Sequence, residues 1–293
     1  MNDLSPVGLL GVGLMGDVFA RRLRAAGFDV VGYDIDATKT KRLVEIGGEA
    51  AASVAEVAAR CGVIMVVVFS TDQVEDVVEN AVLPAVGGNS NKILLCASTC
   101  DPERLAGLGE RVSRRGIRFL ETPVSGTSKE VECGAGTGLI GGDPALAAEV
   151  KPVLDALYAR MFHIGGYGDG SRAKLAINLI LGINRTALAE GLVFAERVGL
   201  DPAKFLDVAK ASAAYSRVME GKGPKMLRGD YTPEGMVAIS LKDATLMRDQ
   251  GRKAGQQLPL LETYRGLLEA CARQGQAELD NSSVIEEIRR RRV

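Results

Sequence analysis

The chain has 293 residues, of which 46% are hydrophobic and 25% charged, and its formal net charge at pH 7 is −1. That length and apolar content suffice for one large or two ordinary globular domains with a buried core. The nearly balanced charge argues against nucleic acid or a membrane surface as a partner.

A glycine-rich turn follows the first predicted strand. The apolar run Val7–Leu10 is followed directly by Gly11-Val12-Gly13-Leu14-Met15-Gly16. We expect a helix from Leu14 to Ala26 and a second strand from Phe28 to Tyr33. A GxGxxG motif alone is weak evidence, but a strand before it and a helix after it predict a dinucleotide-binding turn.

Each position of this turn meets a physical demand of such a site. Gly11 lets the chain turn sharply out of the strand, and Gly13 lets the backbone approach a pyrophosphate. Gly16 lets the helix lie close against the strand. At Leu14 and Met15 the helix begins, and its free N–H groups and positive dipole end are directed at the phosphates.

Asp34 ends the second predicted strand, 18 residues after Gly16. A carboxylate roughly 20 residues beyond the motif meets the ribose hydroxyls of the adenosine. It also repels a 2′-phosphate, and Ile35 supplies no arginine to reverse that preference. The sequence therefore favours NAD. NADP is the alternative because Lys39, Lys41 and Arg42 follow closely, although such cations can simply form a solvated helix face.

Strand and helix patterns alternate through the first half of the chain. The further strands expected are Val63–Phe69, Lys92–Ala97, Ile117–Glu121, Thr137–Gly141 and Met161–Ile164. The helices expected between them include Ser53–Arg60, Thr71–Asn80, Pro102–Arg115 and Pro144–Leu157. Continuous apolar strands indicate a sheet that is covered on both faces. We therefore expect an α/β fold with a Rossmann-type, doubly wound, mainly parallel sheet.

The pattern changes at the glycine-rich stretch 165–170. Beyond it the helices expected are Ser171–Val198, one after Asp201-Pro202, one around Val237–Ala254, Pro259–Arg273 and a short terminal one. This division predicts a dinucleotide-binding domain at 1–165 and an all-α substrate and oligomerisation domain at 166–293. Polar residues interrupt the long helix too often for a lipid span. We expect it to be buried within its domain and against another subunit of a homodimer or homotetramer.

The histidine and the cysteines do not predict a metal site. His163 is the only histidine, and its apolar strand-like surroundings predict a packed structural role. Cys96 and Cys100 have no second pair at metal-ligand spacing. Because the five cysteines are odd in number and no signal segment opens the chain, we expect a cytoplasmic protein.

Lys174 and Asn178 are the best candidates for proton transfer. They are four residues apart on the predicted long helix, so both side chains can face one side. A Lys/Asn pair at this spacing is usually surface decoration. This pair, however, opens the helix directly after the glycine-rich stretch, beside the cofactor domain.

A polar turn, Thr122–Ser128, follows the strand that ends at Glu121. In a parallel sheet, ligands bind at the carboxyl ends of the strands. Free backbone N–H groups together with Ser and Thr hydroxyls suit a carboxylate ligand. An ordinary turn begun by proline is the alternative.

These motifs, in this order and spacing, resemble those of the β-hydroxyacid dehydrogenases over nearly the whole chain. The glycine turn corresponds to the family's cofactor motif, and Pro123-Val124-Ser125-Gly126-Thr127 to its substrate-binding motif. The segment 170–178 matches the catalytic motif, with Lys174 as the catalytic lysine. Leu241-Lys242-Asp243 looks like the motif whose lysine, Lys242, lies by the nicotinamide, and Ala97-Ser98-Thr99 like a cofactor loop.

The resemblance implies an enzyme that transfers a hydride between a nicotinamide cofactor and a small 3-hydroxy acid or its semialdehyde. Lys174 would exchange the proton of the substrate oxygen, with Asn178 orienting both. Ser125, Gly126 and Thr127 would hold the acid group so that the reacting carbon meets the ring.

Two positions depart from the family's pattern. Ser70, in Val68-Phe69-Ser70, replaces the Asn or Thr that usually contacts the cofactor. Thr127, followed by Ser128, replaces a second glycine and adds hydroxyls to the substrate site. The change at Ser70 concerns a side-chain contact to the cofactor, and the change at Thr127 concerns the identity of the substrate rather than the reaction.

Two other functions stay open at this stage. An imine-reducing enzyme on the same scaffold is disfavoured by Lys174 and Asn178 together with Ser125-Gly126. A non-catalytic nucleotide-binding oligomerisation module would not need the lysine, and such a protein usually carries an added binding domain.

Overall fold

The computed structural model describes residues 4–87 and 91–292, which divide into two compact units. The first unit extends to Lys174 and the second begins at Leu175. The helix α10 (Asp169–Arg197) starts in the first unit and continues into the second.

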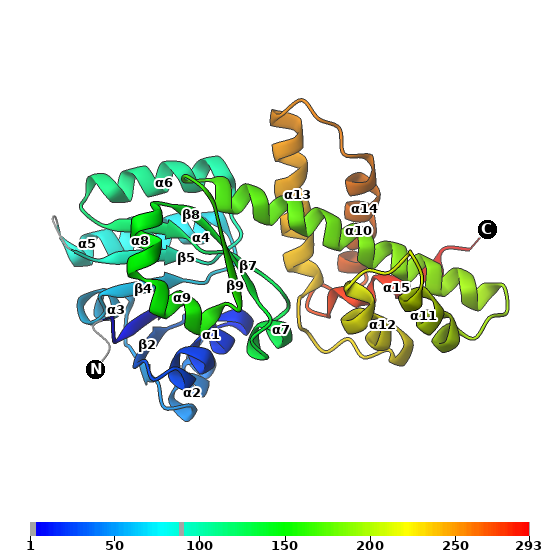
Figure 1. Ribbon diagram of the computed structural model, residues 1–293, viewed down its shortest axis with the longest axis horizontal. Helices are drawn as coiled ribbons and strands as arrows, with labels where there is room; N and C mark the ends of the chain where they lie inside the picture. Colours follow the sequence, from blue (N-terminus) through cyan, green and yellow to red (C-terminus); the bar gives the residue numbers. More distant parts are fainter. Residues whose placement is uncertain (1–3, 88–90, 293) are drawn as a thin grey trace. The chain divides into compact units, whose positions relative to one another are not determined.

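The first unit is built on a sheet of nine strands among its described residues (Figure 1). The strands are β1 (Val7–Leu10), β2 (Val30–Tyr33), β3 (Glu49–Ala50), β4 (Val63–Val66), β5 (Ile93–Cys96), β6 (Arg118–Glu121), β7 (Val124–Ser125), β8 (Thr137–Gly142) and β9 (Arg160–Gly165). The first six are parallel and lie in the order β3-β2-β1-β4-β5-β6, which is the order of dinucleotide-binding sheets. β8 is antiparallel to β6 and to β7 and parallel to β9, so the expected mainly parallel sheet is confirmed.

Helices cover both faces of this sheet. They are α1 (Leu14–Ala25), α2 (Ala37–Glu45), α3 (Val54–Arg60), α4 (Thr71–Asp76), the π-helical η1 (Val77–Val82), α5 (Leu83–Val86), α6 (Pro102–Arg114), α7 (Ser128–Glu132), α8 (Pro144–Glu149) and α9 (Lys151–Leu157). Neighbouring strand residues point to opposite faces. On β1, Leu9 packs in the core that contains α1 and α9, and Leu10 in the core that contains α3 and α6. The doubly wound architecture expected from continuous apolar strands is therefore confirmed.

Two helices differ from the sequence expectation. The stretch Thr71–Asn80 is not one α-helix, because α4 passes into the π-helical η1 at Val77. The stretch Pro144–Leu157 is divided at Val150 into α8 and α9. Pro152 explains the division, because a proline inside a continuous helix lacks the N–H and clashes with the preceding turn. In the first turn of α9 it is tolerated.

The expected burial of His163 is wrong. β9 pairs with β8, and most of its side chains, including Phe162 and His163, are exposed. The Nε2 atom of His163 lies 2.8 Å from the carbonyl oxygen of Gly142, so the imidazole is held at the surface. An apolar run predicts a strand, but it does not distinguish a covered strand from an exposed one.

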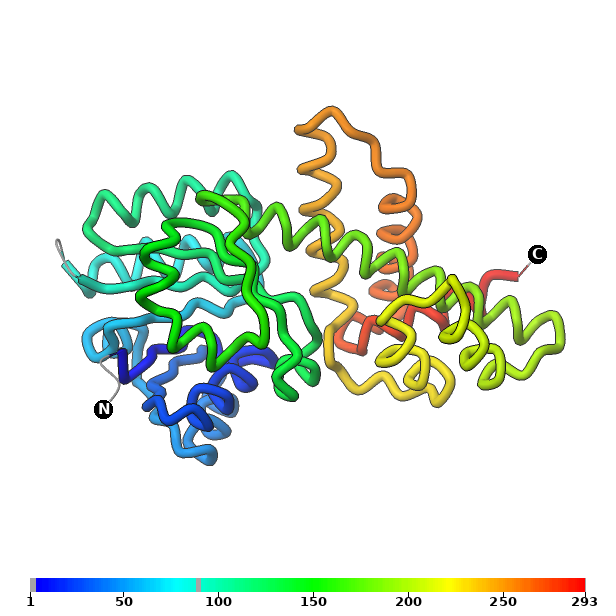
Figure 2. The backbone as a smooth tube through the Cα atoms, in the orientation of Figure 1, coloured from blue at the N-terminus to red at the C-terminus, as the bar shows by residue number. Residues whose placement is uncertain are grey.

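Among its described residues the second unit consists of helices and their connecting loops, with one isolated β-bridge between Met236 and Asp280. Besides α10 it contains α11 (Pro202–Ala211), α12 (Val218–Arg228), α13 (Val237–Lys253), α14 (Pro259–Arg273), the short 3-10 helix η2 (Asn281–Ser283) and α15 (Val284–Arg290). α13 and α14 lie side by side (Figure 2). α12 is absent from the sequence expectation because Gly221, Gly223 and Pro224 obscure its helical pattern.

The helix α10 is only partly covered within the single chain. By length and composition alone, it is the one helix among the described residues that would be long and apolar enough to cross a membrane. Only 39% of the apolar window that meets this test is buried inside the structure. This helix therefore keeps an apolar face that the described residues do not cover, and its expected burial against another subunit stays a prediction.

Candidate active site

The glycine turn packs its backbone closely against neighbouring carbonyl groups. At Gly11, φ is +96°, and a Cβ would lie 2.4 Å from the carbonyl oxygen of Val67. A Cβ at Gly16 would lie 2.1 Å from the carbonyl oxygen of Gly11. Gly13 differs, because no heavy atom beyond its chain neighbours lies within 4 Å of the position of a Cβ. Two of the glycines are therefore required by packing, and the third faces open space.

The N-terminus of α1 begins at this open position. Gly13 is the N-cap, and no side chain among the described residues caps it. The first helical bond runs from Asp17 N–H to the Gly13 carbonyl oxygen (2.9 Å). The N–H groups of Leu14, Met15 and Gly16 come before it, where helices leave donors for an anion such as pyrophosphate.

Asp34 connects the end of β2 to the glycine turn. One carboxylate oxygen accepts from Val12 N–H at 2.8 Å, and the other from Asp36 N–H at 2.9 Å. Lys39 Nζ lies 3.6 Å from this carboxylate. Since each carboxylate oxygen can accept more than one hydrogen bond, the group keeps acceptor capacity for ribose hydroxyls.

The loops after β4 and β5 are joined by Ser98. Its hydroxyl donates to the carbonyl oxygen of Val68 (2.8 Å) and accepts from Val68 N–H (2.9 Å). Thr99 follows it and is half-buried. The hydroxyl of Ser70 accepts from Gln73 N–H and caps α4, which is a structural role that the sequence expectation did not include.

The turn after β6 differs from its expectation at Thr127. Rather than leaving its N–H free, Thr127 forms a capping box at the start of α7: its N–H donates to Glu130 Oε2 (2.8 Å), and its hydroxyl accepts from Glu130 N–H (3.2 Å). The hydroxyl proton of Thr127 is still able to donate to a ligand. Gly126 has φ of +144°, a conformation that favours glycine, and Ser125 is half-buried on β7.

Lys174 lies at this same turn. Its side chain is buried, with 9% of the residue exposed, and its Nζ donates to the carbonyl oxygen of Val124 at 2.6 Å. Val124 directly precedes Ser125, which is 49 residues before Lys174 in sequence. The first unit therefore brings the expected catalytic lysine to the expected substrate turn.

Glu121 attaches the start of α10 to the end of β6. The residue is fully buried, and its carboxylate accepts from Gly168 N–H, from Ser171 N–H (2.7 Å) and from the Ser171 hydroxyl (2.7 Å). Burial raises the pKa of Glu121, and these donors oppose that effect. Glu121 is not among the predicted site residues, although a lone acid at the end of an apolar strand is a recognisable signal.

Asn178 and Lys242 both associate with Asp243 in the second unit. Asn178 Nδ2 donates to Asp243 Oδ2 at 2.8 Å, and Lys242 Nζ lies 2.9 Å from Asp243 Oδ1. Asp243 is nearly fully buried, so the amide and the ammonium hold it from two elements, α10 and α13. Asp243 belongs to the Leu241-Lys242-Asp243 motif, but residue spacing does not predict its pairing with Asn178, which is 65 residues away.

Two family models match nearly the whole chain. Residues 6–165 match the model described as the NAD binding domain of 6-phosphogluconate dehydrogenase. Residues 168–288 match the model described as NAD-binding of NADP-dependent 3-hydroxyisobutyrate dehydrogenase. The chain belongs to the β-hydroxyacid dehydrogenase family.

Relatives in this family share its length and fold. The chain is 31% identical to L-threonate dehydrogenase of Cupriavidus necator, over 95% of this chain and 94% of that protein. It is 32% identical to glyoxylate/succinic semialdehyde reductase 1 of Arabidopsis thaliana, over 97% and 98% of the two chains. The crystal structure of 3-hydroxyisobutyrate dehydrogenase from Salmonella typhimurium superposes with a TM-score of 0.87 at 29% identity, covering 96% and 98%.

This β-hydroxyacid dehydrogenase is a nicotinamide-dependent oxidoreductase of small hydroxy acids or their semialdehydes. The residues of its first unit fit the cofactor by a structural test. The position of a Gly13 Cβ is open and adjoins uncapped helix donors, as the approach of a pyrophosphate requires.

Two alanine variants separate packing from cofactor binding. Gly16→Ala is expected to lower the free energy of unfolding by more than about 1 kcal/mol, because its Cβ meets a backbone oxygen. Gly13→Ala is expected to keep wild-type stability but to weaken cofactor binding at least about tenfold, a loss of about 1.4 kcal/mol. Urea unfolding and fluorescence titration with the dinucleotide measure the two effects. Wild-type cofactor affinity in Gly13→Ala would contradict the assignment of the turn.

Proposed function

We propose that Lys174 is the general acid and base of a hydride transfer between the nicotinamide and a small 3-hydroxy acid or its semialdehyde. The observation that carries this proposal is the 2.6 Å hydrogen bond from Lys174 Nζ to the Val124 carbonyl oxygen. It brings a buried ammonium to the turn that contains Ser125 and Gly126. The relatives named above act, by their names, on L-threonate and on glyoxylate or succinic semialdehyde, which are small carboxylates that carry a hydroxyl or an aldehyde group.

In this mechanism the protein groups have separate tasks. The bound nicotinamide supplies or accepts the hydride at the reacting carbon. Lys174 donates a proton to the substrate oxygen in reduction and removes it in oxidation. Ser125 and Gly126, with the hydroxyl of Thr127, hold the substrate carboxylate. Asn178, fixed by Asp243, orients the reacting oxygen.

Replacement of the lysine tests this role. Lys174→Ala is expected to lower kcat at least about a hundredfold, within the usual range for loss of a general acid or base. Cofactor affinity is expected to stay within a few-fold of wild type. Arg172→Ala is the matched control, because Arg172 lies in the same helical turn but is exposed and paired with Asp169. Steady-state assays with short 3-hydroxy acids measure both variants, and wild-type kcat in Lys174→Ala would overturn the proposal.

Assays of the same kind, with amine substrates added, distinguish the proposed function from the two alternative functions. An imine reductase would turn over amine substrates in preference to hydroxy acids. A non-catalytic nucleotide-binding module would bind the dinucleotide and turn over neither. Activity on hydroxy acids that depends on Lys174 excludes both alternatives.

We infer that the preferred cofactor is NAD rather than NADP. The carboxylate of Asp34 is held at the end of β2 by two backbone N–H groups, so it cannot turn away from a bound adenosine ribose without losing them. An ionised carboxylate there opposes a 2′-phosphate. Lys39, 3.6 Å away, is already associated with Asp34 and Asp36, which reduces the positive charge it offers to a phosphate.

Cofactor preference is therefore expected to depend on the charge of Asp34. In wild-type protein, kcat/KM is expected to be higher with NAD than with NADP. Asp34→Asn is expected to lower the ratio of the two at least about tenfold, equivalent to about 1.4 kcal/mol. Asp29→Asn, which removes an exposed acid in the same unit, is expected to leave the ratio unchanged. A wild-type preference for NADP would contradict this reading of Asp34.

We also propose that the chain assembles into a homodimer or homotetramer through α10. Five exposed side chains and the half-buried Ile183 recur at alternating spacings of four and three residues: Ala176, Ile180, Ile183, Ala187, Glu190 and Phe194. This spacing forms a single stripe along a helix and is typical of helices that pack against another helix. Ile180 is 61% exposed and Phe194 66% exposed, which is unusual for large apolar side chains on one helix face.

Charge in this stripe is expected to prevent assembly. Ile180→Glu combined with Phe194→Glu is expected to convert the oligomer to a monomer in light scattering after gel filtration. Leu260→Glu, at a comparably exposed leucine of α14, is the control and is expected to keep the wild-type mass. A wild-type protein that is monomeric at micromolar concentration would exclude the proposed assembly.

A further inference from the structure

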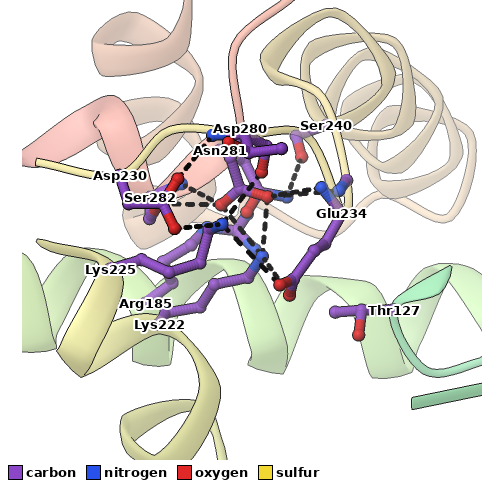
Figure 3. Close-up of polar contacts among 12 residues, drawn as sticks. Thr127, Arg185, Lys222, Lys225, Asp230, Glu234, Ser240, Asp280, Asn281 and Ser282 are labelled. Atoms are coloured by element: carbon purple, nitrogen blue, oxygen red, sulfur yellow. Dashed lines mark hydrogen bonds and ion pairs between the residues drawn. The ribbon is translucent and has the colours of Figure 1, made fainter. Parts of the chain in front are cut away.

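The segment 229–236 joins α12 to α13 without a helix or strand of its own, yet charged groups hold it closely (Figure 3). α13 follows this segment and carries Lys242 and Asp243 in its second turn. The groups that fix the segment therefore determine where α13 begins.

Asp280 is the centre of these contacts. It is fully buried, and its carboxylate accepts from Lys222 Nζ (2.8 and 2.9 Å) and from the N–H groups of Glu234 (2.9 Å) and Gly235 (3.2 Å). It also accepts from the N–H and hydroxyl of Ser282 (3.0 and 2.7 Å). One carboxylate thus joins α12, the segment 229–236 and η2.

A second buried lysine holds the same segment. Lys225 lies one helical turn after Lys222 on α12, and both are 4% exposed. Lys225 Nζ donates to the Thr232 carbonyl oxygen at 2.9 Å and lies 3.6 Å from Glu234 and from Asp230. Glu234 also lies 3.7 Å from Lys222. Both ammonium groups therefore reach the segment from one face of α12 (Figure 3).

Backbone hydrogen bonds connect the chain beside Asp280 to the first turn of α13, which directly follows the segment 229–236. Val237 N–H donates to the Leu279 carbonyl oxygen (3.0 Å), and Ala238 N–H to that of Ala277 (2.9 Å). These bonds satisfy the first donors of α13, which has no side-chain N-cap. Asn281, next to Asp280, donates from Nδ2 to the Ser240 hydroxyl at 3.0 Å. The chain at 277–281 therefore fixes the first turn of α13.

Stability alone does not account for ion pairs in such a place. Burying charges costs desolvation free energy, and well-packed apolar residues often stabilise a fold as well or better. What a buried pair with many donors provides is a fixed geometry. We propose that Lys222 and Asp280 are a positioning pair for the active site, which sets the start of α13 and thereby the placement of Lys242 and Asp243.

This inference rests on the proposed function, since it takes Lys242 and Asp243 to belong to the active site. Neither Lys222 nor Asp280 is expected to touch substrate or cofactor. Their removal should therefore lower kcat while leaving KM for the hydroxy acid within about threefold. A readout that needs no substrate, amide hydrogen exchange across residues 230–243, reports the same geometry independently.

The experiment compares two double variants of the full-length protein. Lys222→Met/Asp280→Asn removes the buried charges together and keeps one acceptor oxygen. Lys210→Met/Glu220→Gln removes a more exposed ion pair of the same unit and is the matched control. The first variant is expected to lose at least tenfold in kcat and to exchange its amides at 230–243 at least tenfold faster. The control is expected to match wild type in both.

Unchanged kcat together with unchanged exchange would overturn the proposal, and so would a lowered melting temperature with wild-type kcat. If the double variant does not fold, Lys222→Arg takes its place, because it keeps a positive charge opposite Asp280 but replaces the compact ammonium with a larger, planar guanidinium. It is expected to speed exchange at 234–238 at least threefold, and wild-type exchange there would overturn the proposal. Full activity in Lys174→Ala would instead contradict the proposed function, while the exchange measurement would still test Lys222 and Asp280.

Discussion

A desolvated carboxylate, Glu121, joins the sheet of the first unit to the helix that carries Lys174. Such a group is costly unless donors surround it, and here the N-terminal turn of α10 supplies them. Gly141 and Gly170 leave room for it, because a Cβ at either position would lie within 3.3 Å of the Glu121 side chain. The bond from Lys174 to Val124 depends on this attachment, since both partners are only a few residues from it.

In the second unit, the buried carboxylate of Asp280 has a role comparable to that of Glu121. The apolar core of this unit packs the helices together, but apolar contact is non-directional and does not by itself set where a helix begins. Hydrogen bonds are directional, and those to Asp280 hold the chain just before α13, as those to Glu121 hold the start of α10 in the first unit. In both units a buried acid collects backbone N–H groups at the end of an element, and a helix that carries proposed active-site residues starts from that point.

The features that depend on residues close together in sequence are the ones that the sequence predicts. The glycine turn, the parallel strands and the helix at Lys174 follow from sterics and from periodicity over a few residues. The polar centres do not, because the partners are 50 residues apart for Glu121 and Ser171, 65 for Asn178 and Asp243, and 58 for Lys222 and Asp280. The hydrogen bonds of Thr127, by contrast, are predictable from sequence, because Thr-Ser-Lys-Glu is a capping-box pattern. The expectation of a free N–H at Thr127 is wrong for this reason.

The continuity of α10 restricts how this chain can change length. The helix has 29 residues and spans about 43 Å at 1.5 Å per residue. Because each residue turns the helix by about 100°, one inserted or deleted residue between Lys174 and Phe194 would rotate the apolar stripe away from its position relative to the lysine. A change of length in this part of α10 therefore alters the direction of every later side chain relative to Lys174, whereas a substitution alters only one side chain.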